Sequence, residues 1–191
     1  MAATPTPMMR QYLELKEKYQ DCILFFRLGD FYEMFFDDAK LASKELELTL
    51  TGKDCGLSER APMCGVPYHA ASAYISRLIE KGYKVAVCEQ LTDPALSKGL
   101  VERDVIRIVT PGTVADPSQL DEKSACYVLC VAFVGKAAAL AYADVSTGEL
   151  IAHLLNDAQR TLRDELMRIR PREIVTNDMA KLTPHLSLIR I

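Results

Sequence analysis

Two apolar runs meet at a turn dipeptide near the start of this sequence, and this junction limits how the chain can fold. Residues 22–28 and 34–36 are strongly apolar, and Gly29-Asp30 lies between them. Glycine accepts a positive φ angle and aspartate hydrogen-bonds its own backbone, so the dipeptide predicts a tight turn. The pattern therefore predicts a β-hairpin whose second strand covers residues 31–36.

Phe31 and Glu33 open this second strand. Because side chains alternate along a strand, both are expected on one side of it and Tyr32 on the other. Two interpretations stay open. In the ordinary hairpin, which the local pattern favours, Phe31 lies in the core and Glu33 is solvated. In the other, the Phe31 ring is held at the rim of the sheet, where it can stack on a flat ring beside a hydrogen-bonding carboxylate.

Length and charge limit the classes of function. The 191 residues suffice for one large domain or two small ones, and 49% hydrophobic against 26% charged residues is typical of a soluble globular protein. The 23 Lys and Arg residues against 26 Asp and Glu give a net charge of -3, so charge alone would not hold the chain to nucleic acid. DNA binding would need a local site or positive charge from another part of a larger protein.

The cysteine spacing favours free thiols. The six cysteines are Cys22, Cys55, Cys64, Cys88, Cys126 and Cys130, and no two have the C-x2-C spacing of a zinc site. We therefore expect a reducing cytosol, with neither a metal site nor a disulfide framework. Residues 1–5 lack the pattern of a signal peptide, and no apolar run reaches the roughly 18 residues of a membrane span.

The first 114 residues predict a mixed α/β domain. Thr6-Pro7 has the pattern of a helix N-cap followed by proline at the first helical position. Helices are expected at residues 7–19, 37–46 and 70–81, and strands at 22–28, 31–36, 48–51, 83–88 and 103–109. Residues 52–62 are expected to form a polar loop.

Residues 115–124 have the polar composition of a linker, so we place domains at 1–114 and 125–191. Short turn sequences separate residues 125–134, 137–144 and 149–154, which predicts an antiparallel meander. A helix at 156–169, capped by Asn156, then leads to a strand at 173–176 that is parallel to one strand of the meander. A short helix from Asn177 and a strand at 186–191 follow, and we interpret the chain as part of a larger protein. The fold class is α/β (mixed α+β).

No enzyme motif stands out. The sequence lacks a phosphate-binding G-x-x-x-x-G-K-[ST] loop, a G-x-S-x-G nucleophile elbow and an H-E-x-x-H zinc motif. His69 could act as a general base, but no nucleophile is placed beside it, which favours a packing or capping role. Asp144 and Glu149 could form a carboxylate pair for a metal-dependent nuclease. The neighbouring strand offers no further acid, so solvation of a turn is favoured.

Five segments resemble a known family in their order and spacing over residues 4–114. They are Thr6-Pro7-Met8-Met9 with Gln11-Tyr12, Phe26-Arg27-Leu28-Gly29-Asp30-Phe31-Tyr32-Glu33, Gly65-Val66-Pro67-Tyr68-His69-Ala70, Cys88-Glu89-Gln90, and Val109-Thr110-Pro111-Gly112-Thr113. Together they are similar to the N-terminal mismatch-recognition domain of the bacterial MutS family of DNA mismatch repair proteins. Residues 125–191 are similar to the connector domain of that family, which has an RNase H-like fold without nuclease activity.

The resemblance implies roles for the hairpin residues. Phe31 matches a phenylalanine that stacks on a mispaired or unpaired base from the minor groove, at a kink in the duplex, and Glu33 matches a glutamate that hydrogen-bonds to that base. A mismatch is easier to unstack and bend than a paired step, so such a wedge selects deformable sites. Further DNA-binding candidates implied by the resemblance are Asp30, Lys53, Met63, Gln90 and Arg103, and no catalytic or metal-binding residue is implied.

The resemblance also implies partners and absent parts. The core, lever, clamp and ATPase domains of the family follow the connector, so we expect no enzyme activity and no cofactor in this chain, with ATP and Mg²⁺ acting in the ATPase domain. Expected partners are mismatched double-stranded DNA and, through the connector, downstream mismatch repair proteins. We expect a homodimer for the full-length protein, a monomer for this chain, and a cytoplasmic location on the nucleoid when DNA is bound. A protein-interaction module or, on the second domain's sheet, a carboxylate-metal nuclease are the alternatives.

Overall fold

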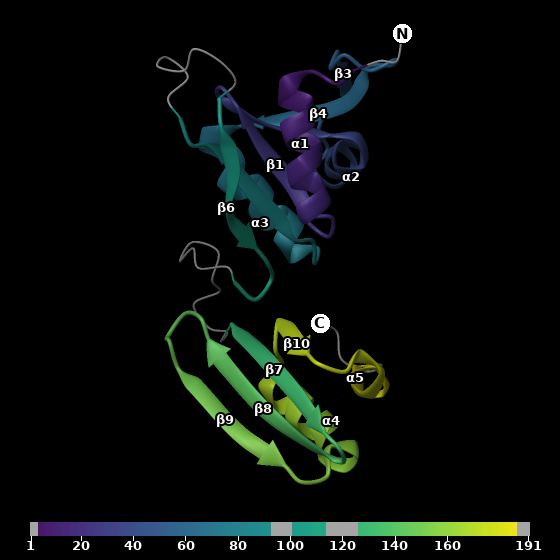
Figure 1. Cartoon of the computed structure of the whole chain (residues 1–191). Coiled ribbons are helices and arrows are strands. Elements are labelled where there is room, and N and C mark those ends of the chain that lie inside the picture. The colour runs from purple at the N-terminus through teal and green to yellow at the C-terminus, as the bar shows by residue number, and fades with distance from the viewer. Residues whose placement is uncertain (1–3, 93–100, 114–125, 187–191) are drawn as a thin grey trace. The chain divides into compact units, whose positions relative to one another are not determined.

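The computed structural model describes residues 4–92, 101–113 and 126–186. The chain divides into two compact units, unit 1 at Met1–Thr110 and unit 2 at Pro111–Ile191 (Figure 1). Both units combine helices with a sheet that contains parallel and antiparallel pairs, so the predicted α/β fold class is confirmed. In the described part of the chain, no helix is long and apolar enough to cross a membrane. The predicted linker at 115–124 lies outside the described residues.

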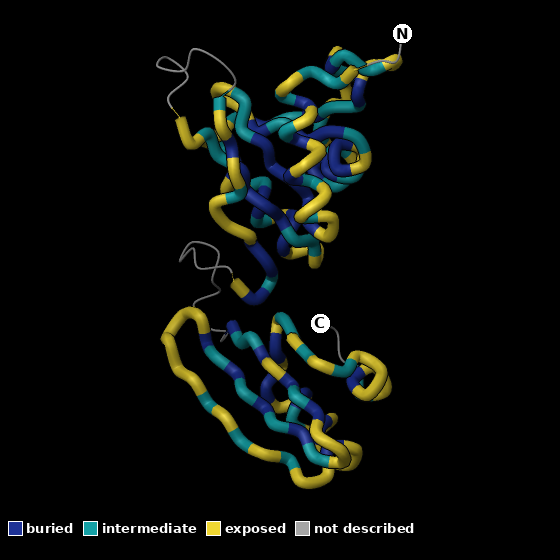
Figure 2. The backbone as a smooth tube through the Cα atoms, viewed as in Figure 1, coloured by how far each residue is buried: buried dark blue, intermediate teal, exposed yellow. Residues whose placement is uncertain are grey.

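Unit 1 is built on a six-stranded sheet in the order β3-β4-β2-β1-β5-β6. Its strands are β1 (Ile23–Leu28), β2 (Phe31–Phe35), β3 (Thr51–Lys53), β4 (Ala61–Pro67), β5 (Val85–Gln90) and β6 (Arg103–Val109). Its helices are α1 (Pro7–Lys18), α2 (Phe36–Leu46), α3 (Ala71–Glu80) and the short 3-10 turn η1 (Tyr68–Ala70). Only the β1–β5 pair is parallel, and the central strands are buried over residues 23–26 and 85–88 (Figure 2).

The predicted hairpin is present. Gly29 has φ 57°, the left-handed conformation that glycine adopts without strain, and it joins β1 to β2. In the antiparallel register Leu28 lies opposite Phe31, and Phe26 lies opposite Glu33. The turn therefore fixes which residues of β2 share a face with which residues of β1.

Helix α1 anchors this hairpin from one face of the sheet. The Thr6 hydroxyl accepts a hydrogen bond from the Met9 N–H at 3.3 Å, so the predicted N-cap is present. The Tyr12 ring packs edge-on against Phe26 and Phe35, and its hydroxyl donates to the Phe35 carbonyl at 3.2 Å. Burial raises the pKa of Tyr12, which keeps the phenol neutral and able to donate.

The prediction for residues 48–67 is right only in part. The strand expected at 48–51 is β3 at Thr51–Lys53, the loop expected at 52–62 is limited to residues 54–60, and residues 61–67, where the sequence predicts no strand, form the long strand β4 (Ala61–Pro67). Pro62 and Gly65 hide the strand pattern in the sequence, because both residues are rare inside strands. β4 forms because it pairs with β2 on one side and β3 on the other, and this tertiary pairing overrides local propensity.

Unit 2 has a four-stranded sheet in the order β10-β7-β8-β9. Its elements are β7 (Tyr127–Val134), β8 (Ala137–Asp144), β9 (Leu150–Leu155), α4 (Ala158–Ile169), β10 (Glu173–Thr176) and α5 (Met179–Leu186). The meander is antiparallel, and β10 pairs in parallel with β7 after the α4 crossover, as the sequence pattern predicts. Leu162 and Leu166 of α4 pack against Leu129, Val131 and Leu140 of the sheet.

Two details of unit 2 differ from the prediction. The N-cap of α4 is Asp157 and not Asn156, and its side chain makes no capping hydrogen bond. Leu186 ends α5 and does not start a strand, while residues 187–191 lie outside the described part. The Leu186 side chain is partly buried and packs against the hydrophobic core of unit 2.

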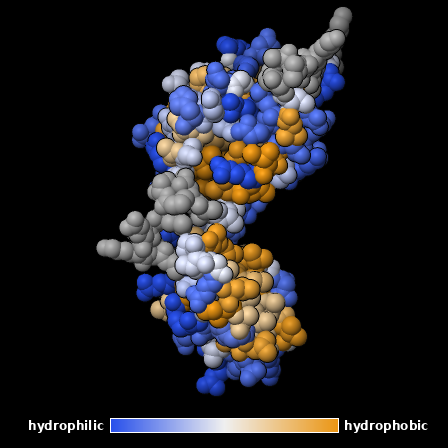
Figure 3. All heavy atoms as spheres, turned by 90° about the vertical axis from the view of Figure 1, so that its left-hand side faces the viewer, coloured by the Kyte–Doolittle hydropathy of each residue, from blue (hydrophilic) through white to orange (hydrophobic). Residues whose placement is uncertain are grey.

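Both units carry exposed apolar side chains on strands. On unit 1 these include Ile106 and Ile108 of the edge strand β6, and on unit 2 they include Val134 of β7 with Leu150 and Leu154 of β9. Figure 3, which looks onto the β6 side of unit 1, shows apolar surface gathered on each unit.

Candidate functional site

Six of the sequence-predicted residues lie on one face of the unit 1 sheet. Strand pairing sets Phe26 opposite both Glu33 and Cys88, Phe35 opposite Met63, and Met63 opposite Thr51. Alternation along each strand then gives one face to the following side chains: Phe31, Glu33, Lys53, Met63, Gln90 and Arg103. The face is the one that α1 covers in part, since Tyr12 packs on Phe26 and Phe35.

Phe31 is exposed. As the first residue of β2 it keeps 47% of its surface in solvent, whereas its neighbour Tyr32 is buried on the other face. The ordinary hairpin with Phe31 in the core is therefore wrong for this chain. An aromatic ring held half in water at the rim of a sheet is free to stack on another flat ring. Asp30, in the turn before it, is also exposed, and its carbonyl accepts the Tyr68 N–H at 2.9 Å.

The back of the hairpin is held by a polar and aromatic cluster. The Arg27 guanidinium lies 3.9 Å from the centre of the Tyr68 ring and 3.6 Å from the Glu89 carboxylate. The Tyr32 hydroxyl also hydrogen-bonds to Glu89. Burial raises the pKa of Tyr32 to about 12, so this phenol stays neutral and donates to the carboxylate. These contacts fix β1 and β2 behind the exposed Phe31 ring.

Glu33 is ion-paired with Lys53. Its carboxylate oxygen Oε2 lies 2.6 Å from the Lys53 Nζ, and the two side chains are 15% and 34% exposed. Gly65 lies opposite Glu33 on the intervening strand β4. A Cβ at Gly65 would be 3.2 Å from the Tyr32 carbonyl oxygen, a tight contact, and 3.5 Å from the Glu33 Cγ, an ordinary one, so the backbones of β4 and β2 approach closely beside Glu33.

Sequence reasoning did not find this pair. Lys53 was assigned to a loop, and only the register of β3 on β4 and of β4 on β2 brings its ammonium to Glu33. Met63 joins the same group, because it lies opposite Phe35 on β2 and Thr51 on β3. Phe31, Glu33, Lys53 and Met63 thus form one continuous patch over β2, β4 and β3, which we call the hairpin patch.

Arg103 and Gln90 lie beyond β1 on the same face. Arg103, a DNA-binding candidate that the resemblance implies, is only 8% exposed at the start of β6. Its guanidinium donates to the Arg27 carbonyl at 2.8 Å and to the Gln11 amide oxygen at 3.1 Å, and burial lowers its pKa. Gln90 is half-buried opposite Arg103. Arg103 therefore ties α1 to β1 beside the hairpin patch.

The thiols and acids of the described residues form no centre of three or more His, Cys, Asp or Glu side chains that could hold a metal. The six cysteines are free, and burial raises the pKa of Cys64 to about 11 and of Cys88 to about 12, so these thiols are protonated and poorly nucleophilic. The Asp144 carboxylate accepts the Ser146 N–H and hydroxyl at 2.9 and 2.6 Å, which lower its pKa. The Asp144 carboxylate therefore stabilises its own turn through these hydrogen bonds, which agrees with the turn role that the sequence analysis favours.

Comparison with known proteins places these two units in one family. The model of MutS domain I matches residues 6–118, and the model of MutS domain II matches residues 126–189. The chain belongs to the MutS family of DNA mismatch repair proteins. The resemblance seen in the sequence is thus confirmed, and the hairpin patch lies in the part that matches MutS domain I.

Curated MutS relatives are similar over almost the whole chain. The DNA mismatch repair protein MutS of Acetivibrio thermocellus is 61% identical over 177 residues, and that of Ruminiclostridium cellulolyticum is 59% identical over 177 residues. The MutS of Clostridium botulinum is 58% identical over 176 residues. Each match covers 92% of this chain but only 19–20% of the relative. The chain therefore spans about a fifth of the length of these MutS proteins.

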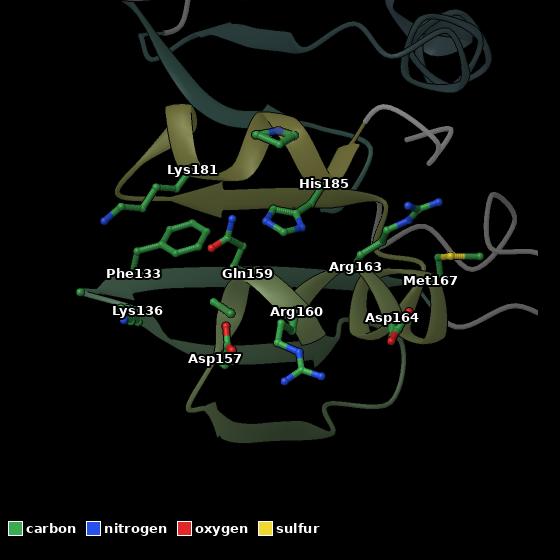
Figure 4. A pocket seen from close by; sticks show the side chains of 13 residues that line it. Phe133, Lys136, Asp157, Gln159, Arg160, Arg163, Asp164, Met167, Lys181 and His185 are labelled. Atoms are coloured by element: carbon green, nitrogen blue, oxygen red, sulfur yellow. The ribbon is translucent and has the colours of Figure 1, made fainter.

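The MutS domain II unit contains a cavity of about 940 Å³ that sequence reasoning missed. It lies between α4, α5 and the β7–β8 turn, and Figure 4 shows Gln159, Arg160 and Arg163 on α4 across from Lys181 and His185 on α5. Its lining combines cationic, apolar and acidic side chains with one histidine. The cations are Lys136, Arg160, Arg163 and Lys181, the apolar residues include Phe133, Met167 and Pro184, the acids are Asp157 and Asp164, and the histidine is His185. Only the packing of α5 beside α4 creates it, which no local pattern indicates.

Proposed function

We propose that this chain recognises mispaired or unpaired bases in duplex DNA, with Phe31 as a wedge and Glu33 as a hydrogen-bonding group at a minor-groove kink. The observation that carries the proposal is the exposed Phe31 ring on the same face as Glu33, two residues away at the rim of a braced sheet. The names of the MutS relatives state DNA mismatch repair, which supports the assignment. Because the chain spans a fifth of those relatives, their activity as whole proteins enters here only as a proposal.

The energetics favour a distorted site. Partial unstacking of a base step costs a few kcal/mol, and stacking on an aromatic ring returns about 1–3 kcal/mol per base. Distorting a paired step costs free energy for both unpairing and bending, whereas a mismatch has already lost part of its pairing and is easier to bend. A wedge that cannot read sequence can therefore still select a mismatch.

The neighbouring residues have proposed supporting roles. Met63 offers an apolar contact next to Glu33, and Gln90 offers an amide on the same face of the sheet. Asp30 sets the turn that presents Phe31. Arg103, whose guanidinium is hydrogen-bonded to Arg27 and Gln11, is proposed to act mainly by holding the sheet and α1 in position beside the DNA.

The test is Phe31→Ala in a chimera, in which this chain replaces the matching 177-residue segment of the A. thermocellus relative. Affinity for a mismatched duplex should fall about tenfold, with little change for a paired duplex, because the lost stacking is made only at the distorted step. Fluorescence anisotropy of labelled duplexes measures both affinities. Ile106→Ala, an exposed apolar residue on β6, is the control. Equal discrimination by the Phe31→Ala variant and the parent would reject the wedge.

A second proposed function is docking of a partner protein at the unit 2 cavity. Four cationic side chains against two acids, with Phe133, Met167 and Pro184 between them, suit an acidic segment with apolar anchors. We propose that a downstream repair protein supplies it. The Arg160→Ala, Arg163→Ala double variant should weaken binding of a glutamate- and leucine-rich peptide, measured by fluorescence titration. Arg168→Ala is the control, because Arg168 lies on the same helix but pairs with Glu165 at 2.6 Å. Unchanged peptide affinity in the double variant would reject this site.

The proposed role is binding and not catalysis. ATP and Mg²⁺ are proposed to act in the part of the full-length protein that corresponds to the remaining four-fifths of the relatives, and the same part is proposed to form the homodimer. The isolated chain is proposed to be a monomer that binds DNA in the cytoplasm. An ATPase assay and sedimentation of the 191-residue chain test both statements. Hydrolysis above the rate of a heat-denatured control, or a stable dimer, would contradict them.

A further inference from the structure

The Glu33 carboxylate, which the proposed function needs for contact with DNA, is already ion-paired with Lys53. Glu33 is only 15% exposed, and its carboxylate already accepts a hydrogen bond from the Lys53 ammonium at 2.6 Å. The pair reaches across β4 at the point where Gly65 has no side chain, and the Lys53 Nζ lies 5.9 Å from the centre of the Phe35 ring. The contact is therefore formed in the protein without DNA, within a well-packed part of the sheet.

We propose that Lys53 is a specificity-determining residue, which holds Glu33 when the duplex is paired and releases it only to the base at a mismatch. The inference rests on the proposed function. In a paired complex, the ammonium balances the carboxylate, so the hairpin patch presents no net charge from these two groups to the phosphates. At a mismatch, a base donor replaces the ammonium at Glu33. Lys53 can then turn to a phosphate, so no charge is left without a partner.

This role differs from that of an ordinary phosphate-binding lysine. A lysine that contacts only phosphates would strengthen binding to every duplex by about the same factor, whatever residue is at position 33. A lysine that balances Glu33 has an effect that depends on Glu33 and on the kind of duplex. Removing Lys53 alone should leave a carboxylate facing the phosphates of paired DNA, while at a mismatch the base still satisfies Glu33.

A double-mutant cycle in the chimera tests this dependence with Lys53→Met, Glu33→Gln and both changes together. Methionine keeps most of the length of lysine without its charge. Lys53→Met should weaken paired-duplex binding about fivefold and mismatched binding less than twofold, so discrimination rises. In the Glu33→Gln background, the loss on paired DNA should shrink to about twofold or less. Equal losses for both duplexes, unchanged by Glu33→Gln, would overturn the inference.

Two control variants complete the cycle. Lys53→Arg should keep the parent's discrimination, because a guanidinium can also pair with Glu33. Lys84→Met removes a lysine that pairs with Asp21 at the opposite end of the sheet, and it should affect both duplexes equally and slightly. An increase in discrimination by Lys84→Met as large as that by Lys53→Met would also overturn the inference.

A measurement without DNA separates this inference from the proposed function. In the 191-residue chain, the NMR signals of the Lys53 ammonium should show slowed hydrogen exchange that Glu33→Gln speeds up. If they do not depend on Glu33, the inference fails while mismatch recognition stands. If instead the parent chimera binds paired and mismatched duplexes equally, the proposed function fails, and the inference with it.

Discussion

At the scale of the residue, the environment of Glu33 decides what its charge does. A carboxylate near DNA repels phosphates unless a hydrogen-bond donor or a cation satisfies it. Lys53 does so at 2.6 Å in the protein alone, so the cost of the Glu33 charge on paired DNA is smaller than for an isolated carboxylate. The discrimination between mismatched and paired DNA that Glu33 provides then depends on whether a hydrogen-bond donor on a base can replace Lys53 at the Glu33 carboxylate.

Glu33→Gln should raise affinity for paired DNA more than for mismatched DNA, so discrimination falls because the reference complex improves. The change removes the repulsion that remains between the Glu33 carboxylate, only partly balanced by Lys53, and the phosphates of the paired complex. We expect a rise of about three- to fivefold for paired duplexes, titrated at one salt concentration in the chimera. Unchanged paired binding with a collapse of mismatched binding would mean that Glu33 acts by attraction alone.

At the scale of the element, α1 keeps β2 straight behind the hairpin patch. The Tyr12 hydroxyl donates to the carbonyl of Phe35, where β2 ends and α2 begins, and lies 3.4 Å from Asp38, whose carboxylate also accepts from the Lys16 ammonium at 2.9 Å. This buried group of hydrogen bonds joins α1, β2 and α2. Its loss should therefore loosen β2.

Tyr12→Phe should lower the amide protection of β1 and β2 about fivefold, because a buried hydrogen bond contributes about 1 kcal/mol and the carbonyl loses its donor. Hydrogen exchange followed by NMR in the 191-residue chain measures it strand by strand. Tyr19→Phe, just beyond the end of the same helix, is the matched control. Equal protection in the Tyr12→Phe variant and the parent would show that the ring alone, through its edge contacts, holds β2.

At the scale of the whole molecule, charge sets how strongly the chain can hold DNA. With 23 Lys and Arg against 26 Asp and Glu, few cations are available for phosphates, and two of those on the proposed DNA-binding face, Lys53 and Arg103, already have partners in the protein. Mismatch selection by shape does not require strong charge attraction, whereas tight binding does.

The isolated 191-residue chain should therefore bind duplex DNA weakly and with a shallow salt dependence, equivalent to about one or two neutralised phosphates. Anisotropy titrations between low and physiological salt give the slope. The chimera, which adds the rest of a MutS relative, provides the comparison and should show a steeper slope. A steep slope for the chain by itself would reveal a basic face that its composition does not suggest.

The sequence predicted the local parts of this structure and missed the non-local ones. The Gly29-Asp30 turn, the N-cap of α1 and the meander of unit 2 follow from short patterns, and the structure has them. Phe31 is harder to predict, because its strand pattern favours the core, while exposure at the rim after the Gly29-Asp30 turn is a second interpretation that the resemblance supports. β4, the Lys53–Glu33 pair and the unit 2 cavity depend on which elements become neighbours, and no single stretch of sequence carries that information.

The cluster of Arg27, Tyr32, Tyr68 and Glu89 has a mechanical consequence. A duplex forced to bend pushes back on whatever holds it open, and that force would act on Phe31 at the tip of the hairpin. Behind the tip, a guanidinium stacked 3.9 Å from an aromatic ring and tied to a carboxylate joins β1, β5 and the turn after β4 into one stiff support. The force on the Phe31 ring is thereby transmitted to three segments of the chain, so the DNA bends while the sheet keeps its conformation.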